Sequence, residues 1–276
     1  MKKIHIVIIV SISMVIIFTL IALSSKKSTI PKKTIFKSAV LKEAESAFSV
    51  GSFKEAKRLY QESLENVDDP NLINSIRQKI EDINIRIIFS KDLDQCSTTY
   101  VVQPKDTLTK ISKKFKTTVS LIKRSNNLSS DTIRPKQKLK VASCEFSIVV
   151  DKSQNLLFLK RKGEVVKTYI VSTGKDNSTP VGKFTIDRNK LRNPTWFRTG
   201  AIVDPADPEN ILGSRWMGLE GKDANGEDIK GYGIHGTTKP QELGKQITLG
   251  CIRMRNQEVE ELFDIVPIGT EVLIID

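Results

Sequence analysis

Residues 248–253 read TLGCIR and place a cysteine, Cys251, directly after a glycine. The stretch YGIHGT at residues 232–237 precedes them and contains His235. The chain has three cysteines and two histidines, and the other histidine, His5, lies in an apolar N-terminal run. A thiol becomes a strong nucleophile when a base or a positive neighbour favours the thiolate. This cysteine and this histidine, each beside small residues, therefore predict a Cys–His site for acyl transfer.

The sequence around this pair reads as a β-rich domain over residues 145–276. Short strand-like stretches at residues 147–150, 156–159 and 165–173 are separated by polar or glycine-containing turns. A last apolar run lies within residues 266–275. Short strands with regular turns predict a mainly β domain of the sandwich or barrel type.

Five blocks in this domain resemble the catalytic domain of the L,D-transpeptidases, the YkuD-like type. Their order and spacing carry the resemblance, since each block alone is a weak signal. The blocks are LLFL at 156–159, VSTGK at 171–175, TPVGKF at 179–184, YGIHGT at 232–237 and TLGCIR at 248–253.

The resemblance implies catalytic roles for four matched residues. Cys251 corresponds to the nucleophile and His235 to the base that takes the thiol proton. The Gly236 carbonyl corresponds to the group that orients the imidazole. The backbone N–H groups of Gly250 and Cys251 are the expected oxyanion donors, because glycine allows close backbone approach.

Four further residues are expected on the substrate side. Arg253 is expected to hold a substrate carboxylate or to shape the acceptor side, since its charged guanidinium group can donate two hydrogen bonds to a carboxylate. The alternative is that Arg253 is a surface ion-pair partner. Tyr232 and Trp216 are expected to line the site, with simple packing as the alternative, and Thr248 is assigned to substrate binding.

Leu249 departs from the family pattern, which usually has a histidine before the Gly-Cys pair. The lost histidine is not the base, so the Cys–His pair remains. We expect Leu249 to pack against an active-site lid, or the activity to be lower or specialised.

The implied reaction is cysteine-dependent acyl transfer on peptidoglycan. It would serve cell-wall biogenesis and the maintenance of cell shape. A tetrapeptide stem would form a thioester at Cys251, which an amine acceptor resolves. Two alternatives stay open: an L,D-carboxypeptidase on the same site, with water as acceptor, and a non-catalytic peptidoglycan-binding scaffold. No cofactor is expected, and no His/Cys/Asp cluster has the spacing of metal ligands.

The net charge of +12 is concentrated in the middle of the chain. Residues 100–143 hold 11 basic and two acidic side chains, whereas residues 145–276 hold 18 and 19. This clustering predicts contact with an anionic surface, and the alternative is a solvated face that only aids solubility. Few aromatic residues lie among the basic ones, so nucleic acid is not an expected partner.

The basic segment has a strand–helix–helix–strand pattern and resembles a LysM domain, which we assign to residues 96–144. Two glycines usual in that family are absent, because Lys105 and Lys136 stand at those positions. The resemblance implies binding to the glycan strands of peptidoglycan, and a module without affinity is the alternative. The matched positions are Tyr100, Val102, 106–108, Ile111, Phe115, 117–119, Asn126, Ile133, Pro135 and 137–139.

Cys96 and Cys144 bracket this module. If its terminal strands pair antiparallel, the two ends come together and a disulfide is geometrically plausible. Such a bond would suit an oxidising compartment and would leave Cys251 free. The alternative is two unpaired thiols.

Residues 1–25 read as a membrane segment. Residues 4–23 carry no lysine, arginine or acidic residue, and about 20 residues at ~1.5 Å each span a hydrocarbon core. A cleaved signal with its apolar core of roughly 7–15 residues is the alternative. We predict a single-pass anchor and a tether at residues 26–37. The cell-wall motifs place the catalytic domain outside the cytoplasm.

Residues 38–95 predict helices. Apolar and small residues recur at helical spacing on both sides of Gly51, and a further amphipathic helix follows over residues 72–88. The first pair resembles one tetratricopeptide repeat, fewer than the three or more that such stacks need. We predict a helical spacer, and the alternative is a hairpin that binds a protein partner.

Overall fold

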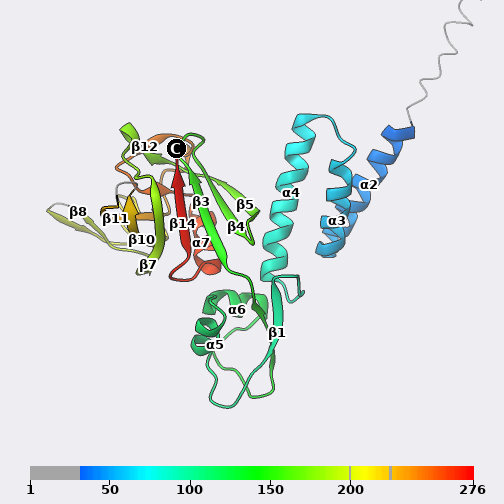
Figure 1. Cartoon of the computed structure of the whole chain (residues 1–276), viewed down its shortest axis with the longest axis horizontal. Coiled ribbons are helices and arrows are strands. Elements are labelled where there is room, and N and C mark those ends of the chain that lie inside the picture. The colour runs from blue at the N-terminus through cyan, green and yellow to red at the C-terminus, as the bar shows by residue number, and fades with distance from the viewer. Residues whose placement is uncertain (1–31, 199, 224–225) are drawn as a thin grey trace, which may run out of the picture.

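The computed structural model describes residues 32–198, 200–223 and 226–276, which form a helical part, a small α/β module and a β domain (Figure 1). The predicted membrane segment at residues 1–25 lies outside the described residues. Among the described helices none is long and apolar enough to cross a membrane. The predicted tether is wrong over residues 32–37, because helix α2 (Lys32–Ser49) already begins at Lys32. No proline or glycine interrupts the chain between Lys32 and Ser49, so nothing stops the helix from starting there.

The predicted helical hairpin is confirmed. Helix α2 turns at Gly51 into α3 (Phe53–Leu64), and the two pack through the buried Ala44, Ala56 and Tyr60. Helix α4 (Pro70–Phe89) follows, and the Asp69 side chain caps it by accepting the Asn71 N–H at 2.9 Å.

Helix α4 belongs to two cores. Ile83 and Ile87 are buried against α2 and α3, whereas Ile85 and Ile88 are buried in the core of the β domain. The predicted helical segment therefore packs directly against the β domain through α4. The sequence concealed this because both faces of α4 are apolar, and periodicity does not say which partner each face meets.

The small module has the predicted βααβ order. Strands β1 (Ser97–Val101) and β2 (Lys138–Ala142) pair antiparallel, and helices α5 (Leu108–Lys114) and α6 (Val119–Ser125) lie between them in sequence. Thr107 and Thr118 cap the two helices through their hydroxyl oxygens. Lys105 and Lys136 both have φ of 68°, so the two turns keep the left-handed backbone although glycine is absent.

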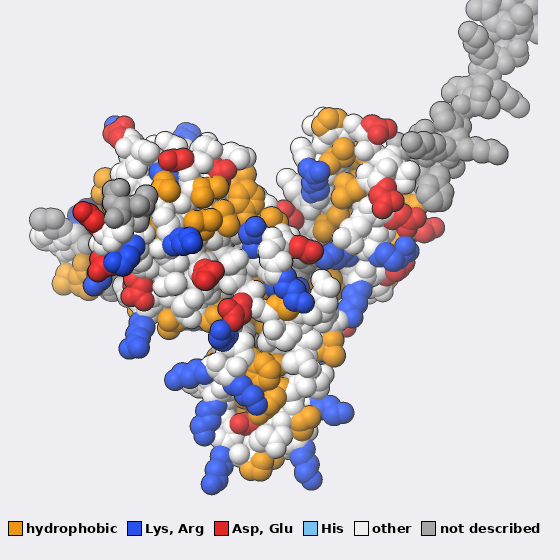
Figure 2. All heavy atoms as spheres, viewed as in Figure 1, with side chains coloured by type: hydrophobic (Ala, Val, Ile, Leu, Met, Phe, Trp, Pro, Cys, Tyr) orange, Lys and Arg blue, Asp and Glu red, His pale blue; other side chains and the backbone are white. Residues whose placement is uncertain are grey.

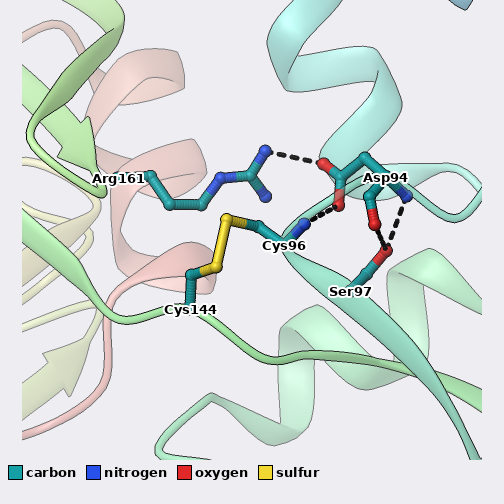
Figure 3. The surroundings of a disulfide bond; sticks show 5 residues. All are labelled: Asp94, Cys96, Ser97, Cys144 and Arg161. Carbon is teal, nitrogen blue, oxygen red and sulfur yellow. Dashed lines mark hydrogen bonds and ion pairs between the residues drawn. A yellow bond between two sulfur atoms is a disulfide. The ribbon is translucent and has the colours of Figure 1, made fainter.

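The predicted disulfide between Cys96 and Cys144 is present, with 5.0 Å between the Cα atoms, and Cys251 is free. Figure 3 shows Asp94 beside it, where the carboxylate accepts the Cys96 N–H and pairs with Arg161 of the β domain at 2.6 Å. The closure of the module therefore also joins it to the β domain.

The β domain is built on one eight-stranded mixed sheet with the order β13-β11-β10-β7-β14-β3-β4-β5. Side chains from strands at both ends of this order share one core with helix α7 (Asn256–Ile265), which requires the sheet to curl. The predicted mainly β fold is confirmed. The strands are β3 (Phe146–Asp151), β4 (Leu156–Arg161), β5 (Glu164–Ile170), β7 (Gly182–Arg192), β10 (Arg215–Asp223), β11 (Asp228–His235), β13 (Ile252–Arg253) and β14 (Glu271–Ile275).

Shorter elements complete the domain around this sheet. Strands β6 (Thr173–Gly174) and β12 (Gln246–Thr248) pair in parallel, and β8 (Trp196–Arg198) forms a hairpin with β9 (Ala201–Val203). Two short 3₁₀ helices lie at Lys175–Asn177 and Pro240–Glu242.

Polar contacts also fix the three parts to one another. The Glu81 carboxylate on α4 accepts the Thr168 N–H at 3.1 Å, which covers part of edge strand β5. Asp264 at the end of α7 pairs with Arg124 of α6 at 3.1 Å and with Arg192 of β7 at 2.9 Å. The helices and the small module therefore contact the β domain directly and are not joined to it by the chain alone.

Candidate active site

Strands β11 and β13 bring Cys251 and His235 to one face of the sheet. The two strands pair in parallel, with Ile234 opposite Ile252. Cys251 directly precedes β13, and the Gly233 backbone, two residues before His235, hydrogen-bonds its thiol. Side chains alternate along a strand, and Ile234 and Ile252 are buried in the core. Cys251 and His235 therefore emerge on the other face, as neighbours on adjacent strands.

The environment of His235 fixes its tautomer and keeps it neutral. His235 is 3% exposed, and its Nδ1 lies 2.7 Å from the Gly236 carbonyl oxygen. A carbonyl can only accept, so Nδ1 donates and Nε2 is left to accept a proton. Burial lowers the pKa of His235 to about 4, backbone hydrogen bonds to Gly236 and Leu212 oppose this shift, and the Arg253 charge adds to it.

Cys251 is a partly buried thiol whose Sγ lies 4.0 Å from the Gly231 carbonyl oxygen. Burial raises the pKa of Cys251, while a hydrogen bond from the Gly233 backbone and the charge of Arg253 act in the opposite direction. Together with the lowered pKa of His235, this makes the resting pair a thiol and a neutral imidazole at neutral pH.

The loop before Cys251 is held by its own hydroxyl groups. Thr248 Oγ1 donates to the Cys251 carbonyl oxygen at 2.7 Å and accepts the Gly250 N–H at 3.2 Å. Thr179 Oγ1 accepts the Gly174 N–H at 2.7 Å and donates to the Gly250 carbonyl oxygen at 2.8 Å. The Thr248 hydroxyl is thus used within the loop.

The backbone at Gly250 admits only glycine. Its φ is 128°, and a Cβ there would lie 2.4 Å from Cε1 of Tyr232. Its N–H already donates to Thr248, whereas in the described part of the chain no acceptor takes the Cys251 N–H. The Cys251 amide is therefore the better placed of the two expected oxyanion donors.

Asn256 holds the segment that follows His235. Its Oδ1 accepts the Thr237 N–H at 3.0 Å and the Ser214 N–H at 3.1 Å from the first residue of α7. Gly236 lies between His235 and Thr237, so this anchor fixes the carbonyl that orients the imidazole.

The expected substrate-side residues lie around this pair. Trp216 stacks on His235 with ring centroids 5.8 Å apart, and the register of β10 and β11 pairs the two residues. Tyr232 lies against Gly250. Arg253 is 11% exposed on its side chain and pairs with Glu242 at 2.6 Å, so it is an ion-pair partner as the alternative has it, but it is largely buried and not at the surface. The Arg253 Nε and the Trp216 Nε1 are buried without a partner among the described residues.

Leu249 is 95% exposed at the tip of the loop beside Cys251. The expectation that it packs against a lid is wrong for this structure. Thr248 and Gly250 on either side are turned inward by their hydrogen bonds, which leaves the Leu249 side chain in solvent.

Sequence reasoning missed Thr179 and Asn256 as parts of the site. Thr179 lies in the matched block TPVGKF, but nothing there shows that its hydroxyl reaches Gly250, 71 residues away. Asn256 had no signal apart from its position just after the Cys251 block. Within the described ranges, no group of three or more His, Cys, Asp and Glu residues could hold a metal ion.

Comparisons with known proteins agree with this geometry. Residues 145–274 match the L,D-transpeptidase catalytic domain and residues 100–142 match the LysM domain. YqjB of Bacillus subtilis (strain 168), which is named as an L,D-transpeptidase, is 42% identical over 130 residues, covering 47% of this chain and 70% of that protein. The chain belongs to the L,D-transpeptidase family.

A second relative of this L,D-transpeptidase matches more than the catalytic domain, and a solved structure matches that domain alone. YkuD of the same organism, also named as an L,D-transpeptidase, is 32% identical over 183 residues, covering 64% of this chain and 98% of that protein. The NMR structure of the Enterococcus faecium L,D-transpeptidase catalytic domain aligns at 24% identity and a TM-score of 0.37, covering 48% of this chain and 97% of that one. The protein is a cysteine-dependent enzyme of this family, and Cys251 is the only cysteine in its catalytic domain.

Proposed function

We propose that Cys251 is the nucleophile and His235 the base of a peptidoglycan L,D-transpeptidase held at the outer face of the cell membrane. The observation that carries the assignment is the bond from His235 Nδ1 to the Gly236 carbonyl, 2.7 Å long. It leaves Nε2 as the proton acceptor on the face of the sheet from which Cys251 emerges.

The reaction proceeds in two acyl transfers. Cys251 Sγ attacks the carbonyl of the L,D peptide bond after the third residue of a tetrapeptide stem, and its proton passes to His235 Nε2. The tetrahedral oxyanion accepts the Cys251 N–H. The C–N bond breaks, His235 returns the proton to the departing D-alanine amine, and a thioester remains. An acceptor amine attacks this thioester, its proton passes to His235 and then to the released thiolate.

The neutral resting pair gives this mechanism a defined proton path. The raised pKa of Cys251 and the lowered pKa of His235 both disfavour a thiolate–imidazolium pair before substrate arrives. The proton therefore moves as Sγ attacks, when the developing charges on substrate and imidazole stabilise each other.

On the substrate side, we assign Arg253 to the acceptor end of the site. Its ion pair with Glu242 at 2.6 Å uses Nη1 and leaves Nε buried and unpaired. An incoming carboxylate would supply that missing acceptor. Trp216 and Tyr232 flank the reacting pair, Trp216 by stacking on His235 and Tyr232 by contact with the loop at Gly250.

Intact mass measurement after exposure to a carbapenem tests the nucleophile, with Cys251→Ala as the control. An adduct on the parent protein and none on the variant supports the assignment. An adduct on neither protein, with peptidoglycan binding intact, supports the scaffold alternative instead. In that case Leu249→His restores the family residue at the exposed loop tip and tests whether Leu249 is the cause.

A muropeptide assay separates transfer from hydrolysis. Tetrapeptide muropeptides are supplied with and without an amine acceptor, and the products are analysed for cross-links. Cross-linked product supports the transpeptidase. Release of D-alanine without cross-links, even with excess amine, assigns the protein as an L,D-carboxypeptidase.

The remaining proposals concern location and partners. Residues 1–25 would anchor the chain as a single span, and the LysM module would hold glycan strands while the catalytic domain modifies their stems during cell-wall biogenesis and shape maintenance. The match to a LysM domain supports the glycan part. Cell fractionation and protease accessibility test the anchor and its orientation, and N-terminal sequencing of the mature protein distinguishes it from a cleaved signal.

A protein partner at the helical hairpin remains a second part of this proposal. Helix α4 is already occupied on both apolar faces, so any partner would have to bind α2 or α3. Crosslinking on intact cells, compared with a protein carrying charge reversals on α3, tests it.

A further inference from the structure

The LysM module carries a set of basic side chains that form no ion pair with an acidic side chain of the described residues. Of its 11 lysines and arginines, Lys116, Lys123 and Arg124 form ion pairs, and the Lys140 ammonium is buried and donates to the Ile87 carbonyl at 2.7 Å. The other seven are exposed and form no ion pair with the described residues. They are Lys105, Lys110, Lys113, Lys114, Arg134, Lys136 and Lys138.

Two of these lysines stand where the backbone disfavours them. Lys105 and Lys136 both have φ of 68°, a conformation that costs a residue with a Cβ roughly 1–2 kcal/mol and costs glycine nothing comparable. Neither ammonium group makes a hydrogen bond or ion pair to the described chain that would offset this. Each turn therefore carries a lysine although glycine would be more stable there. This indicates that the two charges serve binding and not folding.

The two turns lie side by side at one end of the module. The Val102 N–H donates to the Gln137 carbonyl at 2.9 Å, and the Lys136 N–H donates to the Val102 carbonyl at 2.8 Å. Lys105 follows three residues after Val102, so both lysines stand at this end, where α5 also begins.

The distribution of charge indicates the shape of the partner. Figure 2 shows Lys and Arg side chains projecting from several sides of the lowest module rather than from one plane. Among its large apolar side chains only Val101 is exposed, so nothing is available to insert into a bilayer. A flexible polymer can follow such a surface, whereas a membrane contacts one side.

The kind of cation is compatible with a flexible phosphate polymer. Six of the seven unpaired groups are lysines, which bind phosphate as mobile point charges, whereas arginine is favoured where a carboxylate or a phosphate is held by a planar bidentate contact. A chain of spaced phosphate charges needs no such fixed geometry. The Tyr100 ring is covered by the Lys114 ammonium at 4.9 Å from its centroid, which removes the main stacking platform that nucleic-acid bases would need.

We propose that this end of the LysM module binds a flexible, base-free phosphodiester polymer of the cell envelope through Lys105, Lys136 and the basic side chains around them. This ligand is additional to the glycan expected for a LysM domain and does not depend on acyl transfer at Cys251.

The test measures binding of the full-length protein to purified poly(glycerol phosphate) of defined length, as a function of salt. Lys105→Gly and Lys136→Gly remove one charge each and relieve the left-handed backbone, so the variants should be at least as stable as the parent. A lysine near an anionic surface contributes roughly fivefold in affinity, so we expect the double variant to bind about twentyfold more weakly, with a shallower salt dependence.

Lys116→Gly is the matched control. Lys116 also has a left-handed backbone, with φ of 48°, but its charge is already paired with Glu145 at 2.6 Å. Its removal should leave affinity within about twofold. An equal loss in this control, or unchanged binding in the double variant, would overturn the proposal.

Two further ligands separate the sources of negative charge. Sacculi stripped of phosphodiester polymers keep their stem-peptide carboxylates, and vesicles with one-third anionic phospholipid present a charged membrane. If the double variant loses affinity for either of these as much as for the polymer, the phosphodiester assignment is wrong. We expect the two substitutions to leave the affinity of the protein for both ligands unchanged.

Discussion

The titration of His235 can be followed directly, because it is the only histidine in residues 32–276. Its pKa is lowered from 6.5 to about 4, mainly because burial disfavours the charged imidazolium. Between these two values the unfolded chain binds a proton that the folded protein excludes. Stability therefore falls as pH falls from about 6.5 to 4 and this loss levels off below 4. A shift of this size corresponds to roughly 3 kcal/mol.

Two measurements check this value. NMR of a ¹³C-labelled histidine side chain gives the pKa of His235 in the folded protein. Denaturant unfolding at pH 7 and pH 4 gives the loss of unfolding free energy for the parent and for His235→Gln. The difference between the two losses is the contribution of His235. Other groups that titrate in this range, such as Glu258, whose pKa burial raises, change the stability of both proteins alike. Their contribution therefore cancels when the variant is compared with the parent. A folded pKa near 6.5, or an equal loss of stability in the variant, would refute the reasoning.

Three further outcomes follow from the hydrogen bonds and the disulfide. Opening the Cys96–Cys144 bond, which spans a sequence separation of 48, should lower the free energy of unfolding by about 4 kcal/mol, measured in denaturant with Cys96→Ser/Cys144→Ser. Asn256→Ala leaves two loop amides without their acceptor and should cost about 2–4 kcal/mol and slow thioester formation, whereas Asn256→Asp keeps the oxygen and most of the rate. Thr179→Val should slow acylation about tenfold or more in stopped-flow carbapenem assays, and Thr179→Ser should recover most of it, because only the hydroxyl holds the Gly250 carbonyl. Recovery in neither conservative variant would count against these positioning roles.

The sequence was sufficient where the signal is local. The strand and helix order of the LysM module followed from apolar spacing and from Thr107 and Thr118, whose hydroxyls cap the two helices. The pairing of Cys96 with Cys144 followed from the antiparallel ends of that module. The neighbourhood of Cys251 and His235 came from the order of the family blocks.

The sequence was insufficient where a contact joins distant segments. The bond from Thr179 to Gly250 and the two bonds to Asn256 depend on loops that only the completed sheet brings together. The exposure of Leu249 depends on which of its neighbours turn inward, and residue type does not reveal that.

Because helix α4 packs on the helical hairpin with one face and on the β domain with the other, it determines where the protein can be truncated. A shortened protein that begins at residue 145 would contain every matched block of the catalytic domain, yet it would lack Ile85, Ile88 and Leu121, which are buried in its core. It would also leave the outer edge of β5 unprotected and expose apolar surface there. The recombinant fragment that behaves as a monomer should therefore keep α4 together with α2 and α3, which cover its other apolar face, and should not start at residue 145.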